Sequence, residues 1–291
     1  MKISTEIESA RKLVGDERAV EYVAKAGFDA WDFSMFPMCR WDWAKNAPCD
    51  EDHPLKEGNY LAFARRLRQI GLDNGIVCNQ AHAPFPSDPA IMGDYLFRAI
   101  ECAAEVGAPI CIIHPYTFTA NCKEARQNIE FYQSLLPFAK QCGVKIATEN
   151  MWRWNNETDR AAFAPCATAE SFNEIIDGVN DESLVACLDI GHAQMMGDLT
   201  SAVDIIHGLG KRLKALHVHD NDCHKDLHQI PFSMKIDFVA VAKALGEIGY
   251  DGDITLECDR YLSAYTKDNA LEGLKKMAES ASKIKDMVLN K

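Results

Sequence analysis

The feature that most constrains the fold is a regular alternation of short apolar runs with longer amphipathic runs along almost the whole chain. The short runs have the composition of buried strands and cover residues 2–6, 30–35, 75–80, 109–114, 144–149, 184–189, 213–217 and 253–257. The longer runs have helical periodicity and cover residues 17–26, 58–70, 95–106, 125–142, 169–177, 200–209, 238–248 and 269–288. Gly71, Gly107 and Gly143 end helical runs just before a strand, which is typical of a helix C-cap that leads into a buried parallel strand.

Strand-then-helix units repeated through 291 residues predict a single (β/α)8 barrel that spans residues 1–291. A doubly wound open sheet is the alternative, but such a sheet usually has a glycine-rich first turn, which this chain lacks. One aromatic insertion at about 36–54, FPMCRWDWAKNAPCDEDHP, interrupts the alternation. It falls on a strand-to-helix loop, the side of a barrel on which active sites are built.

Composition narrows the classes of partner. Lys and Arg total 31 against 43 for Asp and Glu, a net charge of −12, which disfavours nucleic acid and anionic lipid and favours a small-molecule substrate. The 11 cysteines stand singly without a CxxC pair, as expected of reduced thiols. Neither a signal-peptide pattern nor a long uncharged apolar stretch is present, so we expect a cytoplasmic protein that does not enter the membrane.

Metal-capable side chains stand at the ends of six consecutive predicted strands. These are His82 (NQAHAPF), His114 (CIIHPY), Glu149 (IATEN), Asp189 (CLDIGH), His217 (ALHVHD) and Glu257 (ITLEC). A barrel gathers its strand ends around one mouth, so residues distant in sequence converge there. Any one of them alone would more often be a helix N-cap or a salt-bridge partner; the repetition at the period of the fold favours a common site.

Glu149, Asp189, His217 and Glu257 form the inner set. Three carboxylates and one imidazole suit a divalent metal such as Mn²⁺, Mg²⁺, Co²⁺ or Zn²⁺. Without a cation, three carboxylates at one mouth would repel one another. The sequence therefore predicts a metal site made by these four residues.

These motifs resemble the xylose isomerase-like barrel superfamily, which holds sugar isomerases and epimerases together with endonuclease IV-type AP endonucleases. The resemblance runs from about His82 to Glu257. In ketose 3-epimerases of this superfamily, Glu, Asp, His and Glu on the last four strands hold one divalent metal, which implies that role for the inner set. The resemblance also implies that Glu149 and Glu257 are the catalytic pair and that His192, in the Asp-x-x-His pair, contacts substrate.

This resemblance implies a divalent-metal-dependent isomerase or epimerase of a sugar or sugar phosphate. Glu149 and Glu257 would transfer a proton next to a metal-bound carbonyl. The residues expected to bind substrate are His82, His114, His192, Trp31, Trp41, Trp152 and Arg153, with Phe36 and Trp154 as further aromatic walls. For the aromatic residues, ordinary packing is the alternative. The arginine that epimerases carry just after their metal histidine has no counterpart, since Cys223 falls near that place.

Two other functions stay open. Endonuclease IV enzymes bind three zinc ions through nine ligands, and this chain has a matching residue type for each: His82, His114, Glu149, Asp189, His192, His217, Asp226, His228 and Glu257. That resemblance implies a second metal held by His192, Asp226 and His228. The acidic charge argues against DNA as substrate. A non-catalytic, metal-dependent sugar-binding barrel is the third function, and a homodimer is compatible with the superfamily.

Overall fold

The computed structural model describes residues 1–42, 44–49, 51–116 and 124–290. Its barrel strands are β1 (Ile3–Thr5), β2 (Ala30–Ser34), β5 (Val77–His82), β6 (Ile110–Ile112), β7 (Lys145–Glu149), β10 (Leu184–Asp189), β11 (Leu213–His217) and β12 (Ile254–Leu256). Six of them pair in the order β11-β10-β7-β6-β5-β2, and β1 pairs with β12. Single bridges between Glu6 and Asp32 and between Val218 and Leu256 join the two sheets along both edges. The predicted (β/α)8 barrel is confirmed.

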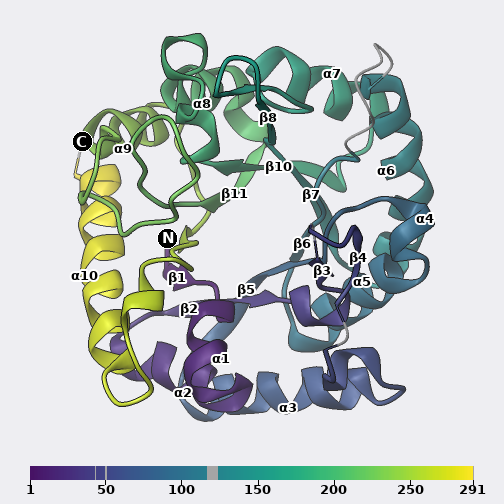
Figure 1. Ribbon diagram of the computed structural model, residues 1–291, viewed down its shortest axis with the longest axis vertical. Helices are drawn as coiled ribbons and strands as arrows, with labels where there is room; N and C mark the ends of the chain where they lie inside the picture. The colour runs from purple at the N-terminus through teal and green to yellow at the C-terminus, as the bar shows by residue number, and fades with distance from the viewer. Residues whose placement is uncertain (43, 50, 117–123, 291) are drawn as a thin grey trace.

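Helices surround the ring of strands (Figure 1). They are α1 (Glu8–Val14), α2 (Asp16–Ala26), α3 (Tyr60–Asp73), α4 (Pro89–Met92), α5 (Tyr95–Val106), α6 (Glu124–Gln141), α7 (Ala169–Val179), α8 (Ala202–Leu209), α9 (Phe238–Glu247) and α10 (Ala270–Leu289). The short helices α1 and α4 were not predicted, because one or two turns give too few residues for a periodic pattern. None of the helices within the described ranges is both long enough and apolar enough to cross a membrane.

Strand alternation decides which side chains enter the barrel. Ala147, Cys187 and Ala215 belong to one small buried cluster inside the barrel, formed by alternate residues of β7, β10 and β11. Successive side chains of a strand point to opposite faces, so Glu149, Asp189 and His217, each two residues further along, also point inward. The small side chains below leave room for these polar ones above them. The apolar core proper lies between the strands and the helices.

The third strand begins later than the sequence indicated. The prediction placed it at 75–80, but β5 is Val77–His82. Gly75 has a φ of +78°, a left-handed conformation that turns the chain after α3 and leaves residue 77 as the first that can extend. His82 is the last residue of this strand, and its side chain lines the cavity at the barrel mouth.

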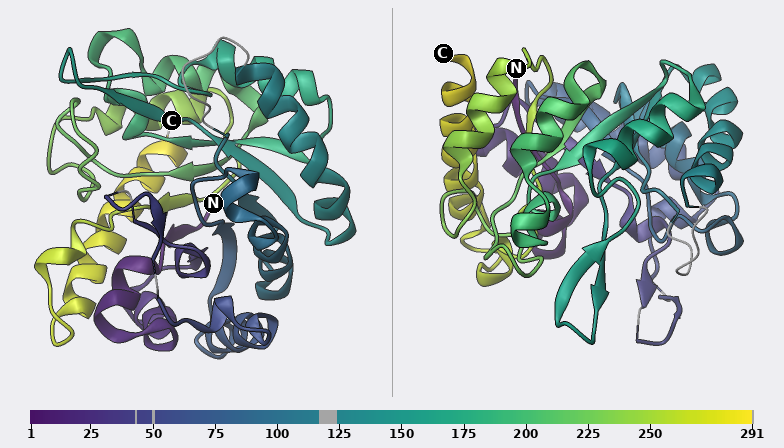
Figure 2. Two further views of the ribbon diagram at one scale, coloured as in Figure 1. Left: turned by 45° about the vertical axis from the view of Figure 1, so that its right-hand side comes forward. Right: turned by 90° about the horizontal axis from the view of Figure 1, so that it is seen from above.

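Two antiparallel hairpins project from the side of the barrel that is opposite the two termini (Figure 2). One pairs β3 (Trp41–Asp42) with β4 (Ala47–Pro48) and belongs to the predicted insertion at 36–54, in which residues 43 and 50 lie outside the described residues. The other pairs β8 (Trp152–Asn155) with β9 (Arg160–Phe163) and was not predicted. Both hairpins follow the carboxyl end of a barrel strand, and they therefore stand beside the mouth where the polar strand ends gather.

Candidate metal and active site

The inner set meets at the barrel mouth. One ligand atom from each of Glu149, Asp189, His217 and Glu257 lies within 4.8 Å of the others. We call these four residues the carboxylate-rich group. Sheet register produces this convergence, because Cys187 of β10 lies beside Glu149 of β7 and Asp189 lies beside His217 of β11. Glu257 follows β12 directly, and its backbone N–H donates to the carbonyl of Val218 at 3.1 Å.

His217 is the centre of this group and is completely buried. Its Nδ1 lies 2.8 Å from Oε1 of Glu149 and 3.6 Å from Oε2 of Glu257. Its Nε2 lies 3.3 Å from Oδ2 of Asp32, a residue of β2 that the sequence reasoning missed. Strand parity was the available signal, because Asp32 occupies an inward position of its strand.

His82 and His114 lie on the other side of Glu149. Their Nε2 atoms are 3.0 Å apart, and Oε2 of Glu149 lies 3.1 Å from Nε2 of His114 and 3.5 Å from Nε2 of His82. Ligand atoms of the three residues are close enough to hold an ion together. Phe36 contacts the His82 ring and Phe85 stacks on the His114 ring, so aromatic side chains limit the freedom of both imidazoles.

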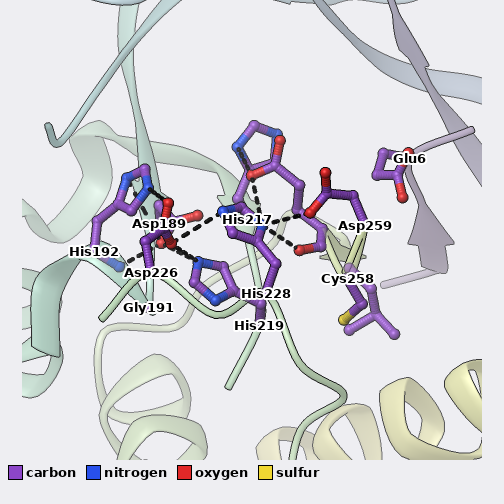
Figure 3. A network of polar contacts seen from close by, with 12 residues as sticks. Glu6, Asp189, Gly191, His192, His217, His219, Asp226, His228, Cys258 and Asp259 are labelled. Carbon is purple, nitrogen blue, oxygen red and sulfur yellow. Dashed lines mark hydrogen bonds and ion pairs between the residues drawn. The ribbon is translucent and has the colours of Figure 1, made fainter. Parts of the chain in front are cut away.

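A second group, rich in histidine, lies beside the first (Figure 3). Its members are His192, His219, Asp226 and His228, whose ligand atoms also lie within 4.8 Å of one another. Oδ1 of Asp226 is 3.0 Å from Nε2 of His228, and Oδ2 is 3.6 Å from Nε2 of His192. We call it the histidine-rich group. His219 was not among the predicted site residues, although it lies in the same HVHD run as His217.

Backbone carbonyls orient several of these imidazoles. Nδ1 of His192 lies 3.0 Å from the carbonyl of Asn150, Nδ1 of His228 lies 2.8 Å from the carbonyl of Glu257, and Nδ1 of His82 lies 2.8 Å from the carbonyl of Ala83. A nitrogen that faces a carbonyl oxygen carries the proton. Each of these rings therefore presents an unprotonated Nε2 to its group when it is neutral, as a metal ligand must.

His219 requires a glycine neighbour. A Cβ on Gly191 would lie 1.9 Å from Cε1 of His219, so no other residue fits at position 191 while the imidazole keeps its place. The His219 ring stacks on His228 with ring centroids 4.0 Å apart, and its Nε2 lies 3.1 Å from Oδ1 of Asp189. The glycine of the CLDIGH run thus makes space for a histidine between the two groups.

The donor set fits divalent cations, because several of its buried polar atoms lack a well-formed hydrogen bond. Oδ2 of Asp189 and Nδ1 of His219 have no partner among the described residues. Oε2 of Glu149, Nε2 of His219 and Oδ1 of Asp226 face only ionisable side chains of the site itself. A buried polar atom without a partner costs about 1–3 kcal/mol. Clustering of such atoms around two points favours bound ions over a purely structural network.

The electrostatics also call for positive charge at these points. Burial alone would lower the pKa of His192, but the carboxylates of Asp189 and Asp226 raise it to about 10. Burial would also lower the pKa of His217 and of His228, but neighbouring carboxylates outweigh it and raise both pKa values well above the usual range. Without metal, protonated imidazoles supply the charge that a divalent cation would otherwise supply.

Both groups border a cavity of about 680 Å³ at the barrel mouth. The aromatic side chains that line it are Phe36, Phe85, Trp152 and Trp154. The charged residues that line it outside the two groups are Glu6, Glu8, Asp259 and Arg260, and Arg260 is the only Lys or Arg among the described lining residues. A groove of about 1220 Å³ between α9 and α10 is larger, but its described lining contains neither His nor Cys.

Three predicted substrate-binding residues do not lie where the sequence suggested. Trp31 is fully buried on the outer face of β2, where it packs against Gly71 of α3, so its assignment to the sugar wall is wrong. Arg153 donates from Nε to the carbonyl of Phe163 at 2.7 Å and is not among the described cavity-lining residues. Trp41 of β3 is half-buried and likewise does not line the cavity. Successive side chains of a strand point to opposite faces. Trp152 and Trp154 of β8 face the cavity, so Arg153 between them faces the other side.

Residues 20–284 match the model of the xylose isomerase-like TIM barrel family. The chain is 24% identical to D-psicose 3-epimerase of Ruminiclostridium cellulolyticum, over 82% of this chain and 76% of that protein. It is 27% identical to a probable endonuclease 4 of Bacillus subtilis, over 68% of this chain and 66% of that protein.

Solved structures have the same fold. The IolI protein, crystallised with a bound zinc atom, matches with a TM-score of 0.73 and 18% identity, over 97% of this chain and 99% of that one. Because the family model matches most of the chain, from α2 into α10, the fold and the sequence lead to one assignment. The protein belongs to the xylose isomerase-like TIM barrel family.

Proposed function

We propose that this protein is a divalent-metal-dependent isomerase or epimerase that acts on a carbohydrate. One observation carries the proposal: Glu149 and Glu257 reach the same point as Asp189 and His217, at the floor of a cavity with aromatic walls. Stacked aromatic faces suit the apolar faces of a sugar, and converging carboxylates suit proton transfer at its carbon atoms. The similarity to D-psicose 3-epimerase supports the same class.

Glu149, Asp189, His217 and Glu257 would hold the metal. When bound there, a divalent ion supplies a Lewis acid that stabilises the negative charge developing on a carbonyl substrate. Each glutamate has a second oxygen besides the one that belongs to the group. Oε2 of Glu149, which faces Nε2 of His114 at 3.1 Å and Nε2 of His82 at 3.5 Å, can accept a proton.

The surroundings of the two glutamates shift their carboxyl pKa values in opposite directions. Burial raises the pKa of Glu257, and His217 and His228 only partly offset it. Burial also acts to raise the pKa of Glu149, but the imidazoles of His217, His114 and His82 outweigh it and hold that pKa well below the usual range. Environments that separate two carboxyl pKa values are typical of acid–base pairs. Glu149 is therefore the proposed base and Glu257 the acid.

The remaining cavity residues would position the sugar. His82, His114 and His192 present nitrogen atoms that can hydrogen-bond to hydroxyl groups, while Trp152, Trp154 and Phe36 enclose the ring. The test is incubation of the metal-loaded protein in D₂O with a panel of ketoses, aldoses, inososes and their phosphates. We expect deuterium on the carbon next to a carbonyl, and no exchange across the panel would contradict the proposal.

A second candidate is an AP endonuclease, which one observation favours. All nine residues that match endonuclease IV ligands lie in three metal-capable groups, two of which share Glu149. The lining of the cavity argues against DNA as substrate. Binding of a phosphate backbone needs Lys and Arg side chains, and only Arg260 is present among the described lining residues. Metal-dependent cleavage of abasic duplex DNA would establish this function, and its absence alongside sugar exchange would exclude it.

We also propose that the histidine-rich group holds a second metal. His192, Asp226 and His228 supply the three expected ligands, and the imidazole of His219 offers a fourth. Three imidazoles and one carboxylate favour zinc over magnesium. Elemental analysis of the purified protein, expected to give two or more ions per chain, tests this, and a single ion would contradict it.

A further inference from the structure

Asp32 is a carboxylate enclosed inside the barrel, beneath the carboxylate-rich group. Its residue is fully buried, and it is not among the described residues that line the cavity. An enclosed charge costs several kcal/mol unless it is paired and hydrogen-bonded. Among the described residues, His217 is the only group that forms an ion pair with it. Within the described ranges His217 is therefore its one ionisable partner, and His217 is a proposed metal ligand.

His217 is oriented differently from its neighbours. His82, His192 and His228 each face a backbone carbonyl through Nδ1 and present Nε2 to their groups. In His217 the two nitrogens are exchanged, because Nδ1 lies 2.8 Å from Glu149 and Nε2 lies 3.3 Å from Asp32. A neutral imidazole carries one proton, so a hydrogen bond from one nitrogen leaves the other as the electron-pair donor.

We propose that Asp32 is the positioning residue of the metal site: it accepts the Nε2–H of His217 and so directs the lone pair of Nδ1 to the metal. The inference depends on the proposed metal role of the carboxylate-rich group and adds the ligand atom and the residue that selects it. An anionic acceptor also makes the imidazole a stronger donor than a carbonyl would.

A chain of polar side chains through the barrel interior keeps Asp32 in place. Gln80, its neighbour across the β2–β5 pair, donates from Nε2 to Oδ2 of Asp32 at 2.9 Å. Behind it, Thr255 donates to Oε1 of Gln80 at 3.3 Å and accepts from Nδ2 of Asn79 at 3.0 Å. Three barrel strands thus fix the carboxylate that fixes His217, as a precise ligand geometry requires.

The first test compares metal affinity in Asp32→Asn and wild type by competition with a chromogenic zinc chelator. The amide has the same shape but no charge, so we expect a loss of about 10–100-fold in affinity at one site, with an unchanged circular dichroism spectrum. Asp220→Asn is the matched control. Asp220 is also fully buried, but the described residues that donate to its oxygens do so through backbone N–H groups, including those of Met234 and Ile236 at 2.8 and 3.1 Å. That variant should lose stability and keep its zinc affinity.

A second measurement does not depend on how the variant folds. In the zinc-loaded wild-type protein with ¹⁵N-labelled histidine, His217 should show a protonated Nε2 and a zinc-bound Nδ1. The opposite tautomer would overturn the proposal. His217→Ala separates this proposal from the one on which it rests. If His217→Ala loses a zinc ion while Asp32→Asn binds zinc with wild-type affinity, the proposed role of Asp32 is wrong and the metal site stands. If both variants bind normally, the metal site itself is misassigned.

Discussion

The two metal-capable groups at the barrel mouth are held by different parts of the fold. The carboxylate-rich group stands on the ends of β7, β10 and β11 and directly after β12, where sheet pairing fixes the backbone of each member. In the histidine-rich group, His192 begins a short 3-10 helix and Asp226 and His228 lie in irregular chain. His228 even has a φ of +42°, in the left-handed region that non-glycine residues rarely adopt.

This difference indicates a division of labour. Residues fixed by a sheet are already arranged for chemistry before any ion arrives. Loop residues gain more order when an ion binds, so a metal in the histidine-rich group should contribute mainly to the stability of the loops around the cavity. The following predictions test that division, from the largest expected effect to the smallest.

Glu257→Gln should have the largest effect on activity. The amide can still occupy the site but cannot transfer a proton, so we expect turnover, measured as deuterium exchange in a responsive sugar, to fall about 10²–10⁴-fold. Asp226→Asn, in the histidine-rich group, should reduce turnover much less. Equal losses in the two variants would remove the distinction between the groups, and wild-type turnover in Glu257→Gln would exclude the catalytic role.

His219→Ala should have the largest effect on stability. The substitution removes one imidazole between the groups, and we expect one bound ion to be lost in elemental analysis. A ligand present at a thousand times its Kd stabilises the folded state by about 4 kcal/mol, so the melting temperature should fall and should no longer respond fully to chelator. An unchanged ion count would contradict the fourth-ligand role. Gly191→Ala should reproduce the loss, because the Cβ would displace the His219 ring.

The metal-free protein should lose stability as the pH rises above neutrality. His192 has a pKa of about 10 in the folded state against 6.5 for an ordinary histidine, so the folded state holds this proton more tightly than the unfolded chain. That stabilisation is fully present below pH 6.5 and is lost as the pH rises toward 10. We expect a change on the order of a few kcal/mol, measured by urea unfolding in chelator. His192→Gln should make the profile less steep without flattening it, because the raised pKa values of His217 and His228 remain. An unchanged slope would show that His192 does not contribute.

Trp154→Ala should have the smallest effect and should act on substrate binding alone. Trp154 lines the cavity from β8 and belongs to neither group, and its ring contacts His224. Loss of one aromatic wall is worth about 1 kcal/mol, so KM should rise several-fold while kcat stays constant. Trp31→Phe is the matched control, because that core residue should change stability and leave KM unaltered. A fall in kcat in Trp154→Ala would show that the hairpin takes part in chemistry.

Most of the barrel was predictable because its signals are local. Apolar runs of strand length and glycines at helix ends lie within a few residues of one another, and each strand-ending residue from His82 to Glu257 was visible in its own motif. Which face of a strand each side chain takes was harder to predict from the sequence. Trp31 and Asp32 are neighbours, and choosing the tryptophan over the aspartate for the site reversed which of them faces the barrel interior.

The sequence by itself determined the repeated strand–helix units, the donor types and their order along the chain. Only the tertiary structure decided that His219 fits against Gly191, that Asp32 reaches His217 across 185 positions, and that Arg153 turns away from the cavity. Periodicity depends on residues close in the chain, whereas these contacts depend on the closure of the ring and the paths of its loops. Closure brings together side chains whose separation in sequence carries no information about their distance in space.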